Sequence, residues 1–243
     1  MKADPASQRR LLGLQQIDTA AARLERRVQT LPLHETIASL AARRSGAADD
    51  VTAAETRRSD AEAALAKAED SVKAVRERLT RDQQRVESGQ MDAKALASMV
   101  DEVDHLKGRV GVLEDAELAA MEALEQAEAA VVAAAARARD VEQGLRTAVG
   151  EREAAVAAAK TEMAGLRGRR QAAVGDLPGE LVTLYDRLRG RYSGVGVGEF
   201  QGNRCTACGL EATAADRARY DGAPADEVLR CAECERILVR PAS

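Results

Sequence analysis

The fold of this chain is decided by the stretch Gly202-Asn203-Arg204-Cys205-Thr206-Ala207-Cys208-Gly209 together with Cys231-Ala232-Glu233-Cys234. The two stretches hold all four cysteines of the chain, as two C-x-x-C pairs. Two intervening residues let a tight turn aim both sulfurs at one point, and two such turns that face each other form the tetrahedral four-sulfur cage preferred by Zn²⁺. The sequence therefore predicts one structural zinc ion, bound by Cys205, Cys208, Cys231 and Cys234.

The predicted metal site is structural, because a four-thiolate cage leaves no coordination position open. A catalytic zinc usually has three protein ligands and a bound water. The two histidines, His34 and His105, lie in helical patterns far from the cysteines, and we expect them to be solvated. A redox dithiol needs one C-x-x-C pair in a βαβ context, which does not fit here. The run Gly194-x-Gly196-x-Gly198 lacks the final spacing and the following helix of a dinucleotide loop.

Catalytic groups are also absent from the sequence pattern. We find no nucleophile paired with a base, no phosphate-binding loop and no open metal site. The sequence therefore predicts a protein that is not an enzyme and has no small-molecule substrate.

The composition favours long helices over a large globular core. Aromatic residues are only 2% of the chain, whereas charged residues are 31%. A net charge of −4 gives no general attraction to nucleic acid or to anionic membranes. No apolar run is long enough to cross a bilayer, and metal binding explains the cysteines better than disulfides do. These features predict a cytoplasmic protein without a membrane partner.

Apolar residues in the first three quarters of the chain follow a heptad pattern, which predicts a coiled coil. The pattern steps by three and four residues from Leu14 to Leu31, is interrupted at Pro32, and resumes from Ile37 to Val86. A second break at 88–92 contains a glycine and a possible helix N-cap, Asp92, and the pattern then restarts. We expect residues 1–175 to form an antiparallel helical hairpin with a break near 32 and its tip near 88–92.

The remaining residues, 176–243, predict a short helix followed by a small zinc ribbon. Leu181, Leu184, Tyr185 and Leu188 share one helical face. Short apolar runs lead into and out of the cysteine pairs and predict β-strands, of which the clearest is 237–239. The predicted fold is thus mainly α: a long antiparallel helical hairpin, or coiled coil, followed by a small C-terminal C4 zinc ribbon with short β-strands.

The order of these motifs resembles the bacterial C4-type zinc-ribbon coiled-coil family (FlgZ/CdsZ-like). The likeness rests on the N-terminal hairpin, Leu-x-x-Leu-Tyr-x-x-Leu-Arg at 181–189, Gly-x-x-Cys-x-x-Cys-Gly at 202–209 and Cys-x-x-Cys-x-Arg-Ile-Leu at 231–238. It implies an adaptor or chaperone for a transcription or secretion component, and a link to messenger RNA binding in one member. The four cysteines match the family's ligand positions. Glu235 departs from the glycine that is usual after the second pair.

Two kinds of partner are predicted. The preferred interpretation is a non-catalytic adaptor that docks onto a protein partner through the hairpin or the ribbon, since long helices offer extended faces for partner helices. A passive spacer or a homo-oligomer is the simpler alternative for any coiled coil.

The second kind of partner is RNA or DNA, bound through the ribbon. It rests on arginines near the cysteines, which can contact phosphates. Eight acidic residues in the same region and scarce aromatic residues count against it. The candidate binding residues are Arg187, Arg189, Arg191, Arg204, Arg219 and Arg236.

Overall fold

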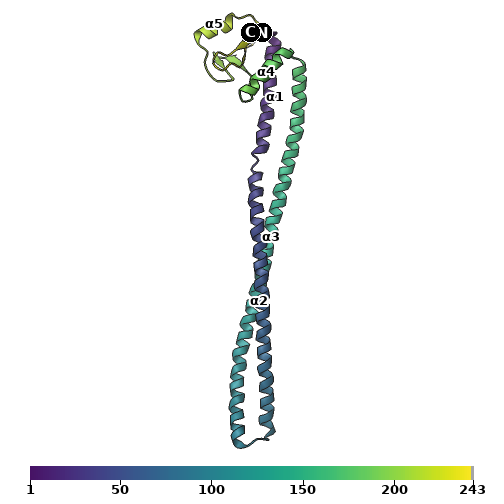
Figure 1. Ribbon diagram of the computed structural model, residues 1–243, viewed down its shortest axis with the longest axis vertical. Helices are drawn as coiled ribbons and strands as arrows, with labels where there is room; N and C mark the ends of the chain where they lie inside the picture. The colour runs from purple at the N-terminus through teal and green to yellow at the C-terminus, as the bar shows by residue number, and fades with distance from the viewer. Residues whose placement is uncertain (242–243) are drawn as a thin grey trace. The chain divides into compact units, whose positions relative to one another are not determined.

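The computed structural model describes residues 1–241, which form long helices and a small sheet (Figure 1). The helices are α1 (Pro5–Gln29), α2 (Leu33–Ser88), α3 (Ala93–Gly175), α4 (Gly179–Arg191) and α5 (Ala214–Gly222). The strands are β1 (Val197–Gln201), β2 (Arg204–Cys205), β3 (Leu229–Arg230) and β4 (Ile237–Val239). The fold is therefore a long helical hairpin followed by a small sheet that carries four clustered cysteines, as the sequence predicted.

The chain forms two compact units. One contains Met1–His34 and Gly150–Ser243, and the other contains Glu35–Val149. The division predicted from the sequence, 1–175 and 176–243, stays a prediction about domains. Within residues 1–241, no helix combines the length and the apolarity that crossing a bilayer requires.

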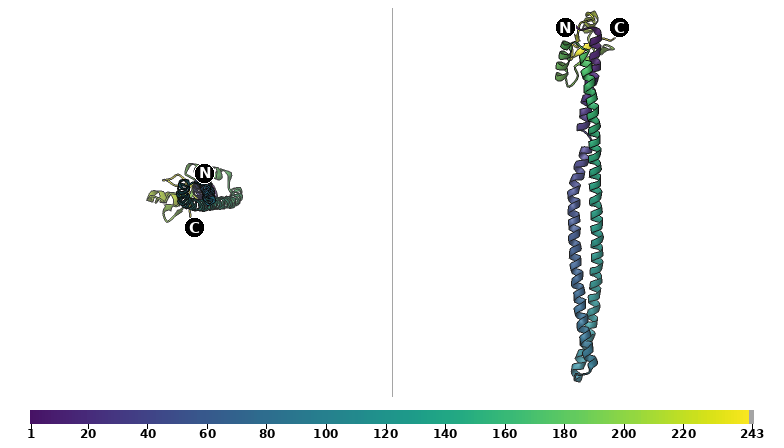
Figure 2. Two further views of the ribbon diagram at one scale, coloured as in Figure 1. Left: turned by 90° about the horizontal axis from the view of Figure 1, so that it is seen from below. Right: turned by 90° about the vertical axis from the view of Figure 1, so that its right-hand side faces the viewer.

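The unit 35–149 is an antiparallel pair formed by α2 and the N-terminal part of α3 (Figure 2). The helices are joined at 89–92, where Gly89 has a φ of 62° and the Asp92 carboxylate accepts a hydrogen bond from the Ala95 N–H at 2.8 Å. This bond caps α3, as predicted. The buried side of α3 includes Val103, Leu106 and Ala134, which follow the predicted heptad spacing.

In the other unit, α1 pairs with the C-terminal part of α3. Asp4 caps α1 by accepting the Ser7 N–H at 2.9 Å, and Pro5 occupies the first turn, where its missing N–H is not needed. Leu24 packs with Ala159 and Leu166 of α3. The helix ends at Gln29, and Pro32 lies in the break before α2.

The four strands form a sheet in the order β2-β1-β4-β3. Strands β1 and β4 are parallel, and the other two pairs are antiparallel. Side chains on β4 alternate between two cores, because successive residues of a strand point to opposite faces. Ile237 and Val239 pack against α1 and α4, whereas Leu238 packs with the cysteines. The sheet thus joins the metal-ligand region to the helices of the same unit.

Two features of this unit were not predicted from the sequence. Helix α5 fills the segment between the cysteine pairs, capped by Thr213. The first three residues also join the ribbon: the Ala3 N–H donates to the Asp226 carbonyl at 2.8 Å, and the Val228 N–H donates to the Met1 carbonyl at 3.1 Å. Leu11 and Leu14 of α1 are fully buried in the same core as α4 and β4. The ribbon is therefore built on the N-terminus of the chain.

Candidate metal centre

The first cysteine turn, Cys205–Gly209 (the first knuckle), follows a tight hairpin between β1 and β2. Gly202 and Asn203 form the turn with φ angles of 58° and 66°, the left-handed geometry that a two-residue hairpin requires. The knuckle closes with a 2.7 Å hydrogen bond from the Gly209 N–H to the Cys205 carbonyl. Gly209 has a φ of 76°, which glycine adopts at no steric cost.

The second turn, Cys231–Glu235 (the second knuckle), repeats this geometry. The Glu235 N–H donates to the Cys231 carbonyl at 3.0 Å, and Glu235 has a φ of 61°. Glu235 thus takes the place that Gly209 has in the first knuckle, although a glutamate does not favour a positive φ. The sequence marked Glu235 as a departure from the family pattern, and the structure shows that the turn keeps its shape.

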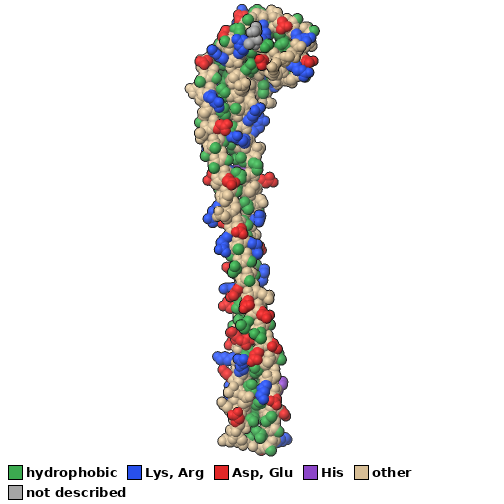
Figure 3. Space-filling view, turned by 180° about the vertical axis from the view of Figure 1, so that it is seen from behind, with side chains coloured by type: hydrophobic (Ala, Val, Ile, Leu, Met, Phe, Trp, Pro, Cys, Tyr) green, Lys and Arg blue, Asp and Glu red, His purple; other side chains and the backbone are tan. Residues whose placement is uncertain are grey.

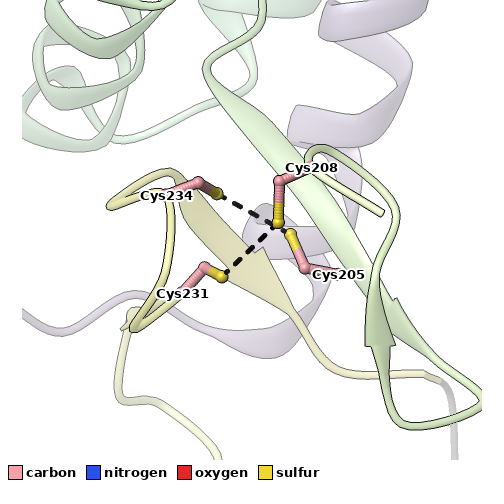
Figure 4. A group of neighbouring side chains, drawn as sticks. All are labelled: Cys205, Cys208, Cys231 and Cys234. Atoms are coloured by element: carbon pink, nitrogen blue, oxygen red, sulfur yellow. Dashed lines mark hydrogen bonds between the residues drawn. The ribbon is translucent and has the colours of Figure 1, made fainter. Parts of the chain in front are cut away.

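The four cysteine side chains converge from the two knuckles (Figure 4). All four Sγ atoms lie within 4.8 Å of one another. The Sγ atoms of Cys205 and Cys234 are 4.0 Å apart, as are those of Cys208 and Cys231. A disulfide would bring two sulfurs to about 2.05 Å. The cluster therefore consists of four free thiols around one point, a donor set that can hold a metal ion.

Burial of the sulfurs strengthens the case for a bound cation. Burial raises the pKa of the Cys205 thiol to about 12, and the nearby sulfurs of Cys231 and Cys234 add to the increase. Burial likewise raises the pKa of Cys231. At Cys234 the effect of burial is outweighed by hydrogen bonds from Arg236 and the neighbouring sulfurs, so its pKa is lowered. Four thiolates this close need a positive charge among them, which a divalent cation supplies.

Different contacts hold the two knuckles in place. Gly198 on β1 backs the first knuckle so closely that a Cβ atom there would lie 2.6 Å from the Ala207 Cβ and 2.7 Å from its backbone nitrogen. The second knuckle is held by Tyr220 of α5, whose hydroxyl accepts the Ala232 N–H at 2.9 Å. The glycine-rich run at 194–198 is thus a packing feature of the ribbon.

A buried cluster of polar side chains fixes β1 to the helices. Asp18 of α1 accepts hydrogen bonds from Arg170 Nε of α3 and from the Tyr185 hydroxyl of α4, both at 2.8 Å. Gln15 accepts the Gly196 N–H and donates to the Gly194 carbonyl, also both at 2.8 Å. The Asp18 side chain is only 3% exposed. These bonds position the strand that leads into the first knuckle.

Three of the six candidate arginines form ion pairs inside the unit. Arg189 lies 3.4 Å from Asp18 and 3.6 Å from Asp186. The other two pairs are at the ribbon surface: Arg204 with Glu211 at 3.1 Å and Arg219 with Asp216 at 3.3 Å. Their positive charges are therefore partly balanced within the chain.

The remaining three arginines differ in their surroundings. Arg236 donates to the Val195 and Tyr192 carbonyls at 2.9 and 3.3 Å, so its guanidinium holds the loop before β1. Arg191 lies 5.4 Å from the centre of the Tyr192 ring. Arg187 is exposed on α4 without an ion pair among the described residues. The six side chains do not gather into one cationic patch of unpaired arginines, and their binding role stays a prediction.

Asp18, Gln15 and Tyr220 were not singled out in the sequence as part of the centre. Gln15 and Asp18 lie in a heptad pattern where polar residues usually face solvent. The available sequence signal was the apolar pair Leu11 and Leu14 on the same helix, and both are fully buried in the structure.

Comparison with known proteins identifies the family. A family model described as the CT398-like coiled coil hairpin domain matches residues 14–193. The chain belongs to this family. The Mycobacterium tuberculosis protein Rv2229c is 33% identical to the chain over 240 residues, covering 99% of this chain and 98% of that protein. The Mycobacterium leprae protein ML1638 is 28% identical over 201 residues, which are 82% of this chain and 85% of that protein.

Solved structures show the same fold. A structure from Mycobacterium smegmatis is 32% identical, has a TM-score of 0.75, and is matched over 99% of this chain and 100% of its own. CT398 from Chlamydia trachomatis has a TM-score of 0.60 at 15% identity, over 97% and 98% of the two chains. HP0958 from Helicobacter pylori has a TM-score of 0.52 at 12% identity, over 99% and 100%. At these low identities the last two show similarity of fold alone.

Proposed function

We propose that this protein is a non-catalytic, cytoplasmic adaptor or chaperone in which one structural zinc ion stabilises a ribbon at the base of a coiled-coil hairpin. The hairpin or the ribbon docks onto a protein partner, which by family resemblance belongs to transcription or secretion. The observation that carries the proposal is the convergence of four sulfurs within 4.8 Å on a sheet whose other face packs on the hairpin helices.

The distances between the sulfurs support zinc as the metal. A tetrahedral site with Zn–S bonds of about 2.3 Å has sulfurs about 3.8 Å apart. The two distances of 4.0 Å between the knuckles are close to that value. Thiolates are soft ligands that favour zinc over magnesium or calcium. With Cys205, Cys208, Cys231 and Cys234 as ligands, the ion has no open position and acts as a structural link.

The size of the ribbon explains why it needs metal. The knuckles rest on little other structure, because β2 and β3 have only two residues each and two of the six buried residues in the core beside them are ligand cysteines. A structural zinc contributes an apparent binding free energy of about 10–16 kcal/mol in small zinc modules. Metal binding therefore supplies much of the free energy that holds the knuckles together.

The buried titratable groups support a role without catalysis. Asp18 and Tyr185 lie in a closed cluster with Arg170, where burial and the bond to Asp18 raise the pKa of Tyr185. The Asp18 side chain is 3% exposed and Tyr185 is fully buried, so a substrate cannot reach them. This arrangement fixes helices to one another and is unsuited to proton transfer with a ligand.

Site-specific photo-crosslinking tests the adaptor role. A photoreactive amino acid is placed at exposed sites on each helix of the hairpin and on the ribbon, and each protein captured in cells is then purified and titrated against the zinc-loaded chain. We expect one partner captured from a contiguous set of sites, with a dissociation constant on the order of micromolar.

Two results would contradict the adaptor proposal. One is that no captured protein binds the purified chain. The other is that labelled RNA or duplex DNA binds tightly at about 50 mM salt and is released at about 200 mM, the behaviour expected of phosphate contacts.

A further inference from the structure

The buried side of α3 in the unit 35–149 has a row of apolar and acidic residues directly beside it. The buried and half-buried residues step by three and four positions from Val103 to Ala134. Residues that immediately follow these positions form a second row with the same spacing, on the flank of the helix pair. Between 118 and 132 this row consists of Leu118, Met121, Glu125, Glu128 and Val132.

Large apolar side chains in this row are exposed to solvent. Leu118 is 58% exposed, Met121 is 45% exposed and Val132 is 66% exposed. Val100 lies in the same row, and the other exposed large apolar residue of α3, Val112, lies on the opposite flank. Single exposed apolar residues are common, but their concentration in one helical row indicates a surface that another molecule covers.

The second helix contributes acidic side chains to the same side. Arg76 of α2 immediately follows half-buried Val75, just as Glu114 of the α3 row immediately follows half-buried Leu113. Arg76 and Glu114 form an ion pair. The α2 residues that immediately follow its buried and half-buried positions form the α2 row. This row therefore lies on the same side of the hairpin as the α3 row. A second cross-helix pair is Arg44 with Glu142 at 3.9 Å. Interpolation between the two pairs places residues 118–132 opposite about 55–71 of α2. The α2 row there contains Glu55, Glu62 and Glu69.

The charged side chains in the two rows of this surface are all acidic, whereas Arg57, Arg58 and Lys67 of α2 lie outside its row. No lysine or arginine occurs between Val110 and Ala136. Among the described residues, the three α2 glutamates and Glu125 and Glu128 have no ion-pair partner. On the side of the hairpin drawn in Figure 3, acidic, basic and hydrophobic side chains are interspersed along its length. We call the surface formed by Leu118, Met121, Glu125, Glu128, Val132 and the row Glu55, Glu62 and Glu69 the acidic–apolar face.

We propose that the acidic–apolar face binds a helix of a protein partner that carries lysines or arginines beside an apolar stripe. This inference rests on the adaptor function proposed above and specifies its surface and partner chemistry. An apolar stripe on the partner covers Leu118, Met121 and Val132, as in helix-in-groove recognition. Its basic residues meet the glutamates on either side, which speeds association and sets the orientation. The same charge repels nucleic acid and anionic lipid surfaces.

Fluorescence polarisation with a designed peptide tests this surface. The probe is a labelled helical peptide of about 20 residues made of leucine and lysine, with the leucines at three- and four-residue steps. A peptide of the same composition, reordered so that no stripe forms, is the control. We expect the zinc-loaded full chain to bind the striped peptide with a dissociation constant on the order of 10 µM, and the reordered peptide at least about tenfold more weakly.

Matched variants separate the face from the rest of the hairpin. Leu118→Ala with Val132→Ala removes exposed apolar area from the face, and we expect binding about tenfold weaker. Val112→Ala makes the same kind of change on the opposite flank and should alter binding by less than about twofold. All three residues are exposed, so helix content measured by circular dichroism should be unchanged.

A second matched set tests the charge. Glu125→Lys with Glu128→Lys should weaken binding about tenfold and reduce its dependence on salt. The control, Asp50→Lys with Asp60→Lys, makes an equal change in net charge. Both aspartates are exposed and immediately precede half-buried residues of α2, so they lie on the opposite flank of the hairpin. We expect less than about a twofold change from that control.

Four results would overturn the proposal. In the first, the control variants weaken binding as much as the variants in the face do. In the second, both peptides bind equally. In the third, light scattering shows a dimer that Leu118→Ala with Val132→Ala dissociates, because a second copy would then cover the face. If crosslinking yields a partner that binds the purified chain elsewhere, the adaptor function stands and this surface assignment fails.

Discussion

The two knuckles have the same backbone shape but different residues at the position that defines it. Gly209 and Glu235 both adopt positive φ and both close the turn onto the carbonyl of the first cysteine. The next residue in each turn, Leu210 or Arg236, offers its carbonyl to the N–H of that cysteine at 3.1 or 3.0 Å. The conformation therefore follows from the need to aim two sulfurs at one point, and glycine only makes it easier to adopt.

Contacts around Glu235 offset part of its backbone strain. Arg230 Nε donates to the Glu235 carbonyl at 2.7 Å, and the Arg230 guanidinium lies 3.1 Å from the Glu235 carboxylate. The first knuckle has a longer version of the same contact, because Arg204, which precedes Cys205, donates to the Gly209 carbonyl at 3.5 Å. The comparison shows that both knuckles share one geometry and one arginine contact. The contact is shorter where the positive-φ residue is the strained Glu235.

Removing a ligand from either knuckle should have the largest effect. Cys205→Ser and Cys231→Ser each remove one of four thiolates, and we expect both to lose zinc and the folded ribbon while keeping most of the helix content. Zinc content by mass spectrometry, limited proteolysis and circular dichroism measure this. Ala232→Ser, at an exposed position inside the second knuckle, is the control and should keep its zinc. Full zinc content and a protease-resistant ribbon in Cys205→Ser or Cys231→Ser would refute the role of the metal.

Crowding the first knuckle should have the next largest effect. In Gly198→Ala the new methyl group meets the backbone nitrogen of Ala207, and we expect a destabilisation of about 2–3 kcal/mol. Because folding and metal binding are coupled, zinc affinity measured by chelator competition should fall roughly 30- to 150-fold. Gly190→Ala, where a Cβ meets no atom within 4 Å, should leave the affinity unchanged. Equal effects from the two variants would show that Gly198 has no special role.

Loosening the second knuckle should cost less. Tyr220→Phe removes the acceptor of the Ala232 N–H but keeps the edge-to-face contact with Phe200. We expect a loss of about 1.4 kcal/mol, which is about tenfold in zinc affinity. Tyr192→Phe is the control, and its zinc affinity should change by less than about twofold. No change in Tyr220→Phe would mean that the knuckle does not depend on α5.

The residue at the positive-φ position should have the smallest effect, with opposite signs in the two knuckles. Gly209→Ala introduces strain of about 1 kcal/mol without a steric clash, so zinc affinity should fall about fivefold. Glu235→Gly relieves similar strain but loses an exposed ion pair, so affinity should rise by less than about fivefold. Glu235→Ala separates the contribution of the backbone strain from that of the ion pair, because it removes the ion pair and keeps the strain. This variant should bind zinc slightly more weakly than the unmodified chain. A gain in affinity for Glu235→Ala would contradict the strain argument.

The helical hairpin and the cysteine cluster were predictable because their signals are local. Steps of three and four residues indicate a coiled coil whatever the rest of the chain does, and Pro32 and Gly89 mark breaks through their own backbone restrictions. Helix α5 was harder to recognise, because Ala214–Gly222 is short and only Tyr220 of it is buried. Its start at the Thr213 cap was the available signal.

The sequence by itself determined the heptad pattern, the helix break near Pro32, the hairpin tip near 88–92 and the four possible metal ligands. Each of these depends on residues close together in the chain. Only the tertiary structure decided that Ala3, Leu11 and Leu14 belong to the core under the sheet. It also decided that Asp18 binds Arg170 and Tyr185, and that Arg76 pairs with Glu114 across the hairpin. These contacts join residues far apart in the sequence, and their partners are set by how helices and strands pack. A polar residue in a heptad looks the same whether it faces water or a buried arginine, and packing alone distinguishes the two.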